Sequence, residues 1–370
     1  MTNLNVLYDD YGQSPWIDNI RRDWLNDGTL ANFIKEGVRG VTSNPSIFAK
    51  ALATSSAYDE FIESSTDDSP EALFESLAVA DVQDACDVLS DVHESSKTAF
   101  ASGSRRYLDG FVSLEVSPQL AHDTDGTIEA AKRLHGRVDR PNVMIKIPAT
   151  KEGLPAIRAV LGTGINVNVT LIFSVVRYNE VITAWRLGLQ DAYDAGLDVG
   201  AIGSVASFFV SRVDVAVDAL LPEGDPRRGT TANAQVASAY ERYRVRVSGD
   251  DVQALLDKGA QVQRPLWAST STKNPTYDDL LYVDTIVADE TVNTMPDGTL
   301  ADTLDHANFA ASVLLNEDTT QKTAALLENL SPDVSLDKVT EQLEVEGVAA
   351  FAKSYEELLA TVASKMHKAK

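Results

Sequence analysis

Residues 143–171 read VMIKIPATKEGLPAIRAVLGTGINVNVTL, and this stretch predicts a strand, a helix and a second strand. Its ends, VMIKIPA (143–149) and INVNVTL (165–171), are short and mostly apolar, and KEGLPAIRAV between them is helix-like. A strand–helix–strand order predicts two parallel strands with the helix packed outside them. The fold class is therefore α/β.

The same alternation of strand and helix signals extends over most of the chain. Asp123 and Ser174 each precede a helix-like segment and are predicted to cap it. Eight strand–helix units predict a (β/α)8 TIM barrel, the closed arrangement that leaves no sheet edge. The other six expected strands are WIDNI (16–20), VRGVTSN (38–44), GFVSLEV (110–116), AIGSVAS (201–207), RPLWAST (264–270) and DTIVAD (284–289).

The chain has 370 residues, more than the roughly 250 that a barrel needs. We expect one domain over residues 1–370, because no long Pro/Gly/Ser linker divides the sequence. The additional length is expected in helical insertions at about 51–105 and 222–260, and in a helical tail at about 315–370.

Charge and cysteine content narrow the function classes. The formal net charge is −23, which argues against nucleic acid or a membrane surface as partner, because both attract clustered cations. The single cysteine, Cys86, excludes an intrachain disulfide and fits a reducing compartment. Neither a signal peptide nor an apolar run long enough to span a membrane is visible. We therefore expect a cytoplasmic protein.

Polar side chains interrupt the predicted strands with a period of two. Glu115, Lys146, Asn168 and Thr170 each alternate with apolar neighbours, so they share one sheet face and are expected to point into the barrel. A charged residue there is costly unless it is paired or lies at the carboxyl end, where barrel enzymes keep their active sites. One reading is a structural Lys–Glu pair. Asp18 and Asn44, also at strand ends, favour an assembled site instead.

A lysine in such a site indicates Schiff-base chemistry. Only about one in 2,500 free lysines carries a neutral amine at pH 7. Burial beside Ile145 and Ile147 would raise that fraction. The resulting iminium accepts electrons from a neighbouring carbon–carbon bond, and Asp18 and Glu115 are the candidates for the accompanying proton transfers.

Seven ordered motifs resemble the transaldolase family, most closely its longer bacterial form. Together they cover every expected strand from the second to the eighth. They are GVTSNPSIFAKA (40–51), FVSLEVSPQLAHDT (111–124), VMIKIPAT (143–150), INVNVTLIFS (165–174), SVASFFVSRVD (204–214), LWASTSTKNP (266–275) and YVDTIVADETVNTMP (282–296).

This resemblance implies an α/β barrel that works without a metal or an organic cofactor. The implied activity is reversible transfer of a dihydroxyacetone unit in the non-oxidative pentose phosphate pathway. The donor is sedoheptulose 7-phosphate or fructose 6-phosphate. The acceptor is glyceraldehyde 3-phosphate or erythrose 4-phosphate.

The resemblance also implies residue roles. Lys146 corresponds to the Schiff-base lysine, and Asp18 to the group that takes the C4 hydroxyl proton. Glu115 corresponds to a second acid/base, working through a water held with Thr170. The implied substrate-binding residues are Asn44, Asn168, Ser207, Phe209, Arg212, Ser271 and Lys273, with Arg212 and Lys273 on the phosphate.

Phe209, Glu115 and the helical insertions bear on whether the chain is a transferase, an aldolase or a non-catalytic scaffold. Related sugar-phosphate aldolases carry tyrosine at the Phe209 position and lack Glu115, so these two residues favour transfer over simple aldol cleavage. Phe208 departs from the family, which has proline there.

A non-catalytic sugar-phosphate-binding scaffold is a third reading, supported by the helical insertions, which could contact other pentose-pathway enzymes. The oligomeric state stays open. The scattered histidines indicate no metal site.

Overall fold

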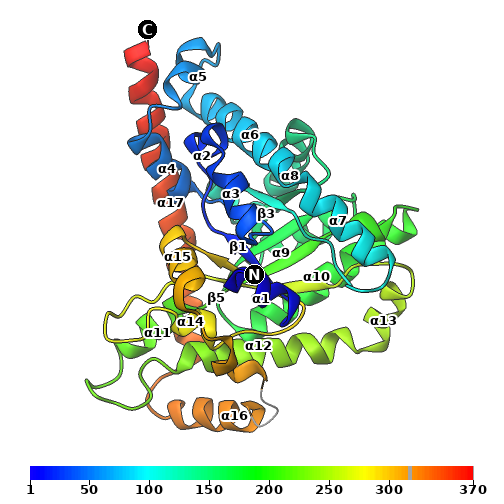
Figure 1. Cartoon of the computed structure of the whole chain (residues 1–370), viewed down its shortest axis with the longest axis vertical. Helices are drawn as coiled ribbons and strands as arrows, with labels where there is room; N and C mark the ends of the chain where they lie inside the picture. The colour runs from blue at the N-terminus through cyan, green and yellow to red at the C-terminus, as the bar shows by residue number, and fades with distance from the viewer. Residues whose placement is uncertain (316–318, 370) are drawn as a thin grey trace.

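The computed structural model describes residues 1–315 and 319–369, and its centre is one parallel β-sheet. Seven strands follow the order β1-β7-β6-β5-β4-β3-β2, with α-helices around them (Figure 1). The strands are β1 (Gln13–Ile17), β2 (Val112–Glu115), β3 (Val143–Pro148), β4 (Val167–Ile172), β5 (Ser204–Phe209), β6 (Gln263–Ala268) and β7 (Thr291–Met295).

The segment around Val41 closes the sheet into a barrel. Val41 forms parallel bridges with Ile17 of β1 and with Val112 of β2. The amide of Thr42 donates to the Ile17 carbonyl at 2.9 Å, and the amide of Ser113 donates to the Val41 carbonyl at 2.9 Å. This segment occupies the position of the eighth strand of the barrel, although it forms only single bridges with its two neighbours. The predicted α/β barrel is therefore confirmed, and the strand expected at 38–44 is shorter than predicted.

Two predicted strands were misplaced. The first runs over Gln13–Ile17 rather than 16–20, and the last over Thr291–Met295 rather than 284–289. Both true strands contain buried polar side chains that made them look like loops. The Gln13 amide, for example, donates to the Ile286 carbonyl at 3.0 Å and to the Thr291 hydroxyl at 2.9 Å. The apolar run at 284–289 is buried packing beside the strand rather than the strand itself.

Helices occupy the segments predicted to hold insertions and a tail. Asp123 and Ser174 cap their helices as predicted, accepting from the amides of Gly126 and Arg177. The α-helices are α1 (Asn3–Asp9), α2 (Arg22–Asp27), α3 (Thr29–Glu36), α4 (Pro45–Thr54), α5 (Asp59–Ser64), α6 (Pro70–Val88), α7 (Ser90–Ala101), α8 (Thr124–Val138), α9 (Gly153–Leu161), α10 (Val175–Asp194), α11 (Ser211–Asp218), α12 (Thr231–Val247), α13 (Asp250–Leu256), α14 (Leu281–Asp284), α15 (Asp297–His306), α16 (Thr319–Leu330) and α17 (Leu336–Ala369). Short 3-10 turns are η1 (Pro118–Leu120), η2 (Val199–Ala201), η3 (Phe309–Ala311) and η4 (Val313–Leu315).

These helices pack on the barrel and on one another. Within the segment 51–105, α6 contacts β2, and within 222–260, α12 contacts β6 and α10. In the tail, α16 contacts α12, and α17 lies against α4 (Figure 1). The parts of the predicted tail at 316–318 and at 370 lie outside the described residues.

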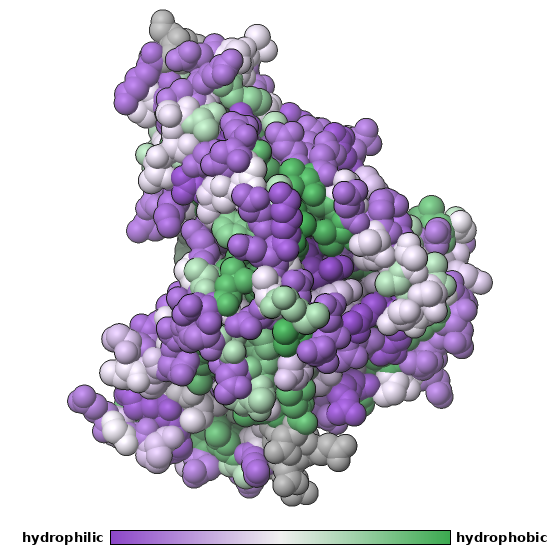
Figure 2. Space-filling model, in the orientation of Figure 1, coloured by the Kyte–Doolittle hydropathy of each residue, from purple (hydrophilic) through white to green (hydrophobic). Residues whose placement is uncertain are grey.

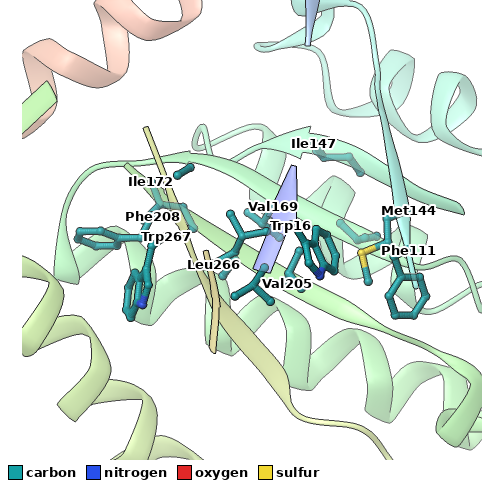
Figure 3. Close-up of a cluster of buried hydrophobic side chains, with 14 of the residues drawn as sticks. Trp16, Phe111, Met144, Ile147, Val169, Ile172, Val205, Phe208, Leu266 and Trp267 are labelled. Carbon is teal, nitrogen blue, oxygen red and sulfur yellow. The ribbon is translucent and has the colours of Figure 1, made fainter. Parts of the chain in front are cut away.

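The core follows the barrel wall. Large apolar side chains from several strands gather there, among them Trp16, Val205, Leu266 and Trp267 (Figure 3). Gly40 is required beside Trp16, because a Cβ at that position would lie 2.4 Å from the indole ring. The face drawn in Figure 2 is mostly hydrophilic. No helix within residues 1–315 and 319–369 is long and apolar enough to cross a membrane.

Candidate active site

Lys146 lies in the carboxyl half of β3 and is 4 % exposed. The period of two places Ile145 and Ile147 on the opposite face of the strand. Its ammonium donates to the Ser43 carbonyl at 3.1 Å and lies 3.4 Å from Glu115 Oε2. The Lys146 amine is therefore shielded from solvent, with a backbone carbonyl and a carboxyl group beside it.

Glu115 is the partner of Lys146 on the neighbouring strand. The Cα atoms of the two residues pair in the β2–β3 register, and the Glu115 side chain is 5 % exposed. Burial raises the pKa of Glu115 to about 7, although the charge of Lys146 acts in the opposite direction. Its Oε2 atom accepts no hydrogen bond from any described residue. Glu115 can therefore both give and take a proton near neutral pH.

Asp18 follows β1 directly and faces the same interior space as Lys146. The hydroxyl of Thr42 donates to Asp18 Oδ1 at 2.6 Å. Burial raises the pKa of Asp18, and the charge of Lys146 and the Thr42 hydrogen bond only partly oppose this effect. Asp18 is therefore a second carboxyl group with a raised pKa, and it lies at the end of a different strand.

Polar side chains on β4 and β5 are organised around Asn168. Its amide nitrogen donates to Ser113 Oγ at 2.9 Å, and its oxygen accepts from Ser207 Oγ at 2.7 Å. Thr170, two residues along β4, is fully buried, and its hydroxyl has no partner among the described residues. Leu171 then adopts φ +59° at an irregularity in the β4–β5 register. Asn168 is thus held firmly, whereas the Thr170 hydroxyl is available.

The cationic end of the site is formed by α11 and by the segment after β6. Arg212, in the first turn of α11, lies over the Phe209 ring at 5.2 Å and has no ion pair with a carboxylate among the described residues. Burial lowers the pKa of Arg212, while the charge of Asp18 raises it. The Lys273 ammonium donates to Ser271 Oγ at 2.6 Å. A guanidinium without an ion-pair partner among the described residues, with an ammonium group nearby, can bind a phosphate group.

Asn44 directly precedes the first residue of α4. It is the N-cap of that helix, and its side-chain oxygen accepts from the Ile47 amide at 3.1 Å. Capping uses the oxygen and leaves the Nδ2 donors for other partners. Asn44 is therefore rigidly oriented and can still donate a hydrogen bond into the site.

One cavity of about 200 Å³ gathers most of the predicted set. Two predicted residues lie just outside its wall: Glu115 contacts Lys146 and lines a larger neighbouring cavity, and Asn168 is bonded to Ser207. Phe208, the departure from the family, packs outward against Tyr178 and Trp267, so β5 stays regular. The predicted residues that line the cavity are Asp18, Asn44, Lys146, Thr170, Ser207, Phe209, Arg212, Ser271 and Lys273.

The cavity also contains residues that sequence reasoning missed. Thr42 and Thr294 lie within quoted motifs, and their hydroxyls are 2.6 Å apart, so a closer reading of strand ends could have found them. Phe351 lies on α17, in the tail, where no local pattern marks it. Among the described residues, no group of three or more His, Cys, Asp or Glu side chains could hold a metal ion.

A parallel barrel with a buried lysine, two carboxyl groups and an arginine around its carboxyl end belongs to the class of α/β-barrel proteins that carry a polar cavity where barrel enzymes keep their active sites. The chain belongs to the transaldolase/fructose-6-phosphate aldolase family, whose model matches residues 15–362.

Curated relatives span nearly the whole chain. "Transaldolase 1" of Streptomyces coelicolor is 45% identical over 366 residues, covering 96% of this chain and 93% of the relative. "Transaldolase" of Saccharopolyspora erythraea is 44% identical and covers 100% and 99%. "Transaldolase" of Thiobacillus denitrificans is 44% identical and covers 95% and 97%.

Proposed function

We propose that this chain is a transaldolase, which moves a dihydroxyacetone unit from a ketose phosphate to an aldose phosphate through a Schiff base on Lys146. The observation that carries the proposal is the cavity in which a buried lysine meets Asp18, Arg212 and Lys273. Full-length relatives named transaldolase support the same activity.

The first step is formation of the Schiff base. The neutral amine of Lys146 attacks C2 of the ketose, and the carbinolamine then loses water to give the iminium. Among the described residues, Glu115 Oε2 and Thr170 Oγ1 have no hydrogen-bond partner although both are buried, so both can hold the water that carries protons. A pKa near 7 lets Glu115 serve in both directions of this step.

The second step is cleavage of the C3–C4 bond. Asp18 takes the proton of the C4 hydroxyl, the bond pair moves into the iminium, and an aldose phosphate leaves. An enamine of dihydroxyacetone remains on Lys146. Its carbon then attacks the aldehyde of the acceptor, Asp18 returns the proton, and hydrolysis of the new iminium releases the product ketose.

Binding is assigned to the remaining polar groups. Asn44 and Ser207 orient the hydroxyl groups of the donor, with Asn168 holding the Ser207 hydroxyl from behind the cavity wall, and Arg212 with Ser271 and Lys273 holds the phosphate. The expected donors are sedoheptulose 7-phosphate and fructose 6-phosphate. The expected acceptors are glyceraldehyde 3-phosphate and erythrose 4-phosphate. With a net charge of −23, only local cations can attract such dianions.

The second candidate function is that of a fructose-6-phosphate-type aldolase, which the family description also covers. Phe209 in the cavity wall and Glu115 beside Lys146 favour the transferase. We further propose that the chain acts as one catalytic domain in the cytoplasm. The packing of α6, α12 and α17 on the barrel supports the first part, and a buried free thiol at Cys86 supports the second.

The test is a transfer assay with fructose 6-phosphate and erythrose 4-phosphate. Sedoheptulose 7-phosphate and glyceraldehyde 3-phosphate should appear, and Lys146→Met should reduce their formation by at least about 10⁴-fold. Lys151→Met, which changes an exposed lysine just beyond the same strand, is the matched control and should retain activity. Rapid release of dihydroxyacetone without an acceptor would identify an aldolase instead. A Lys146→Met enzyme that still transfers would exclude the Schiff base.

A further inference from the structure

The longest helix, α17, is fixed across the carboxyl end of the barrel. Near its start, Glu344 pairs with Arg177 of α10 at 3.2 Å. One turn later Gly347 lies so near β4 that a Cβ there would be 3.1 Å from Leu171 Cδ2. Toward its end, Lys365 donates to Asp59 of α5 at 2.6 Å. The helix is therefore tied to elements on two sides of the barrel opening, beside α4 (Figure 1).

Phe351 is the residue that α17 places in the active-site cavity. Its side chain is buried, with 5 % exposure, and it lines the same cavity as Asp18 and Arg212. Its ring centroid lies 5.7 Å from the Lys146 ammonium. Of the described residues of α17, it is the one that lines this cavity. An apolar ring thus covers the nitrogen at which the proposed intermediates form.

Neighbouring contacts hold this ring in place. Ser354, three residues along the same helix face, accepts a hydrogen bond from Ser46 at 2.8 Å. Tyr355, four residues along, packs edge-on against Phe74 of α6 with ring centroids 5.9 Å apart. Because Ser46 also lines the cavity, the position of α17 and the position of the site wall are coupled.

The covered nitrogen matters because the enamine has two fates. Attack on an acceptor aldehyde forms the iminium of the product ketose, and hydrolysis of that iminium completes transfer. Protonation of the enamine carbon gives an iminium, and addition of one water then releases dihydroxyacetone, the free Lys146 amine and the proton. Both fates end in hydrolysis of an iminium on Lys146, but only the second begins with protonation of the enamine carbon. An apolar side chain packed beside the Lys146 nitrogen restricts the access of water that would deliver this proton.

We propose that Phe351 is a specificity-determining residue that keeps the intermediate for transfer by limiting the water that can protonate the enamine carbon on Lys146. The inference rests on the proposed function and deepens it. Phe351 neither donates nor accepts a proton. The Phe351 ring affects whether the enamine reacts with the acceptor aldehyde or is protonated by water.

The experiment compares two rates in each variant: transfer from fructose 6-phosphate to erythrose 4-phosphate, and dihydroxyacetone release from fructose 6-phosphate alone. In Phe351→Ala the ratio of release to transfer should rise by about tenfold or more. Phe351→Leu, which keeps an apolar side chain, should raise it less. Val345→Ala, on the exposed side of the same helix, is the matched control and should leave the ratio unchanged.

A ratio is chosen because a general loss of folded enzyme lowers both rates equally. If Phe351→Ala does not fold, Phe351→Leu still decides the matter, and an unchanged ratio in a folded Phe351→Leu enzyme overturns the proposal. Failure of the proposed function looks different. In that case the unmodified enzyme itself shows no transfer and forms no adduct on Lys146, whatever residue occupies position 351.

Discussion

Both ends of the barrel bury a carboxyl group beside a cationic side chain. The buried carboxyl group at the amino end has many polar partners, whereas the one at the carboxyl end has few. At the amino end, Asp109 is fully buried and meets Arg264 at 3.3 Å and Arg39 at 3.0 Å. It also accepts hydrogen bonds from Ser14 and Trp16. At the carboxyl end, Lys146 is the one ion-pair partner of Glu115 among the described residues, and none of these residues donates a hydrogen bond to Glu115 Oε2.

The difference appears in the pKa of each carboxyl group. Burial alone would raise the pKa of Asp109, but two arginines and two hydrogen bonds hold it below its usual value. Burial dominates for Glu115, and its pKa rises to about 7. A fully satisfied carboxylate stabilises the fold, whereas a poorly satisfied one is ready to exchange a proton. The comparison separates a structural ion pair from the Lys146–Glu115 pair that we propose to be catalytic.

The largest effect on this comparison is expected from Asp109→Asn. It leaves the buried Arg264 without its charge partner, which should lower the free energy of unfolding by about 3–5 kcal/mol at pH 7. Because the folded pKa of Asp109 is depressed, its contribution is present above the usual carboxyl pKa and is lost as pH falls through the folded value. Urea unfolding at several pH values measures this.

The matched control is Asp191→Asn, which removes a surface pair with Arg158 and should cost less than about 1 kcal/mol. Equal losses in the two variants would mean that the amino-end network contributes no more than a surface ion pair.

Glu115→Gln tests the opposite end. The folded pKa of Glu115 is raised, so the wild type loses stability as pH rises from about 4.5 to about 7, and the variant lacks this loss. Relative to wild type, Glu115→Gln should gain up to about 3 kcal/mol over that range. The measurement is unfolding of both proteins by urea at pH 5 and pH 8. A difference that stays constant with pH would contradict the assignment.

The smallest effect concerns the phosphate. Arg212→Ala should raise KM for fructose 6-phosphate about 10- to 100-fold, because an uncommitted guanidinium is lost. Lys273→Ala should have a smaller effect, since the Lys273 side chain is exposed and solvent screens its charge. Unphosphorylated fructose is the control substrate. If Arg212→Ala impairs fructose and fructose 6-phosphate equally, Arg212 does not bind the phosphate.

The sequence predicted the strands on which apolar and polar side chains alternate clearly. Glu115, Lys146 and Asn168 stand at successive register positions because that alternation is strict in β2, β3 and β4. It failed for β1 and β7, where Gln13 and Thr291 form a buried polar pair that resembles a loop in sequence. Burial of a polar group becomes understandable only when its partner is known.

The missed parts of the site have a similar explanation. Phe351 reaches the cavity because a tail helix packs back over the barrel, and this long-range packing leaves no local pattern in the sequence. Asp109 likewise precedes its strand and meets Arg264 only in the folded barrel. Residues within one strand motif could be predicted, whereas residues brought together across the chain could not.

The central claim, that the poorly satisfied carboxyl end is the reacting end, rests on Lys146 as the nucleophile. Borohydride reduction during turnover of fructose 6-phosphate, followed by peptide mass mapping, tests it most directly. We expect one reduced dihydroxyacetone adduct, located on Lys146. An adduct on Lys273, or an unmodified Lys146 in fully active enzyme, would contradict it.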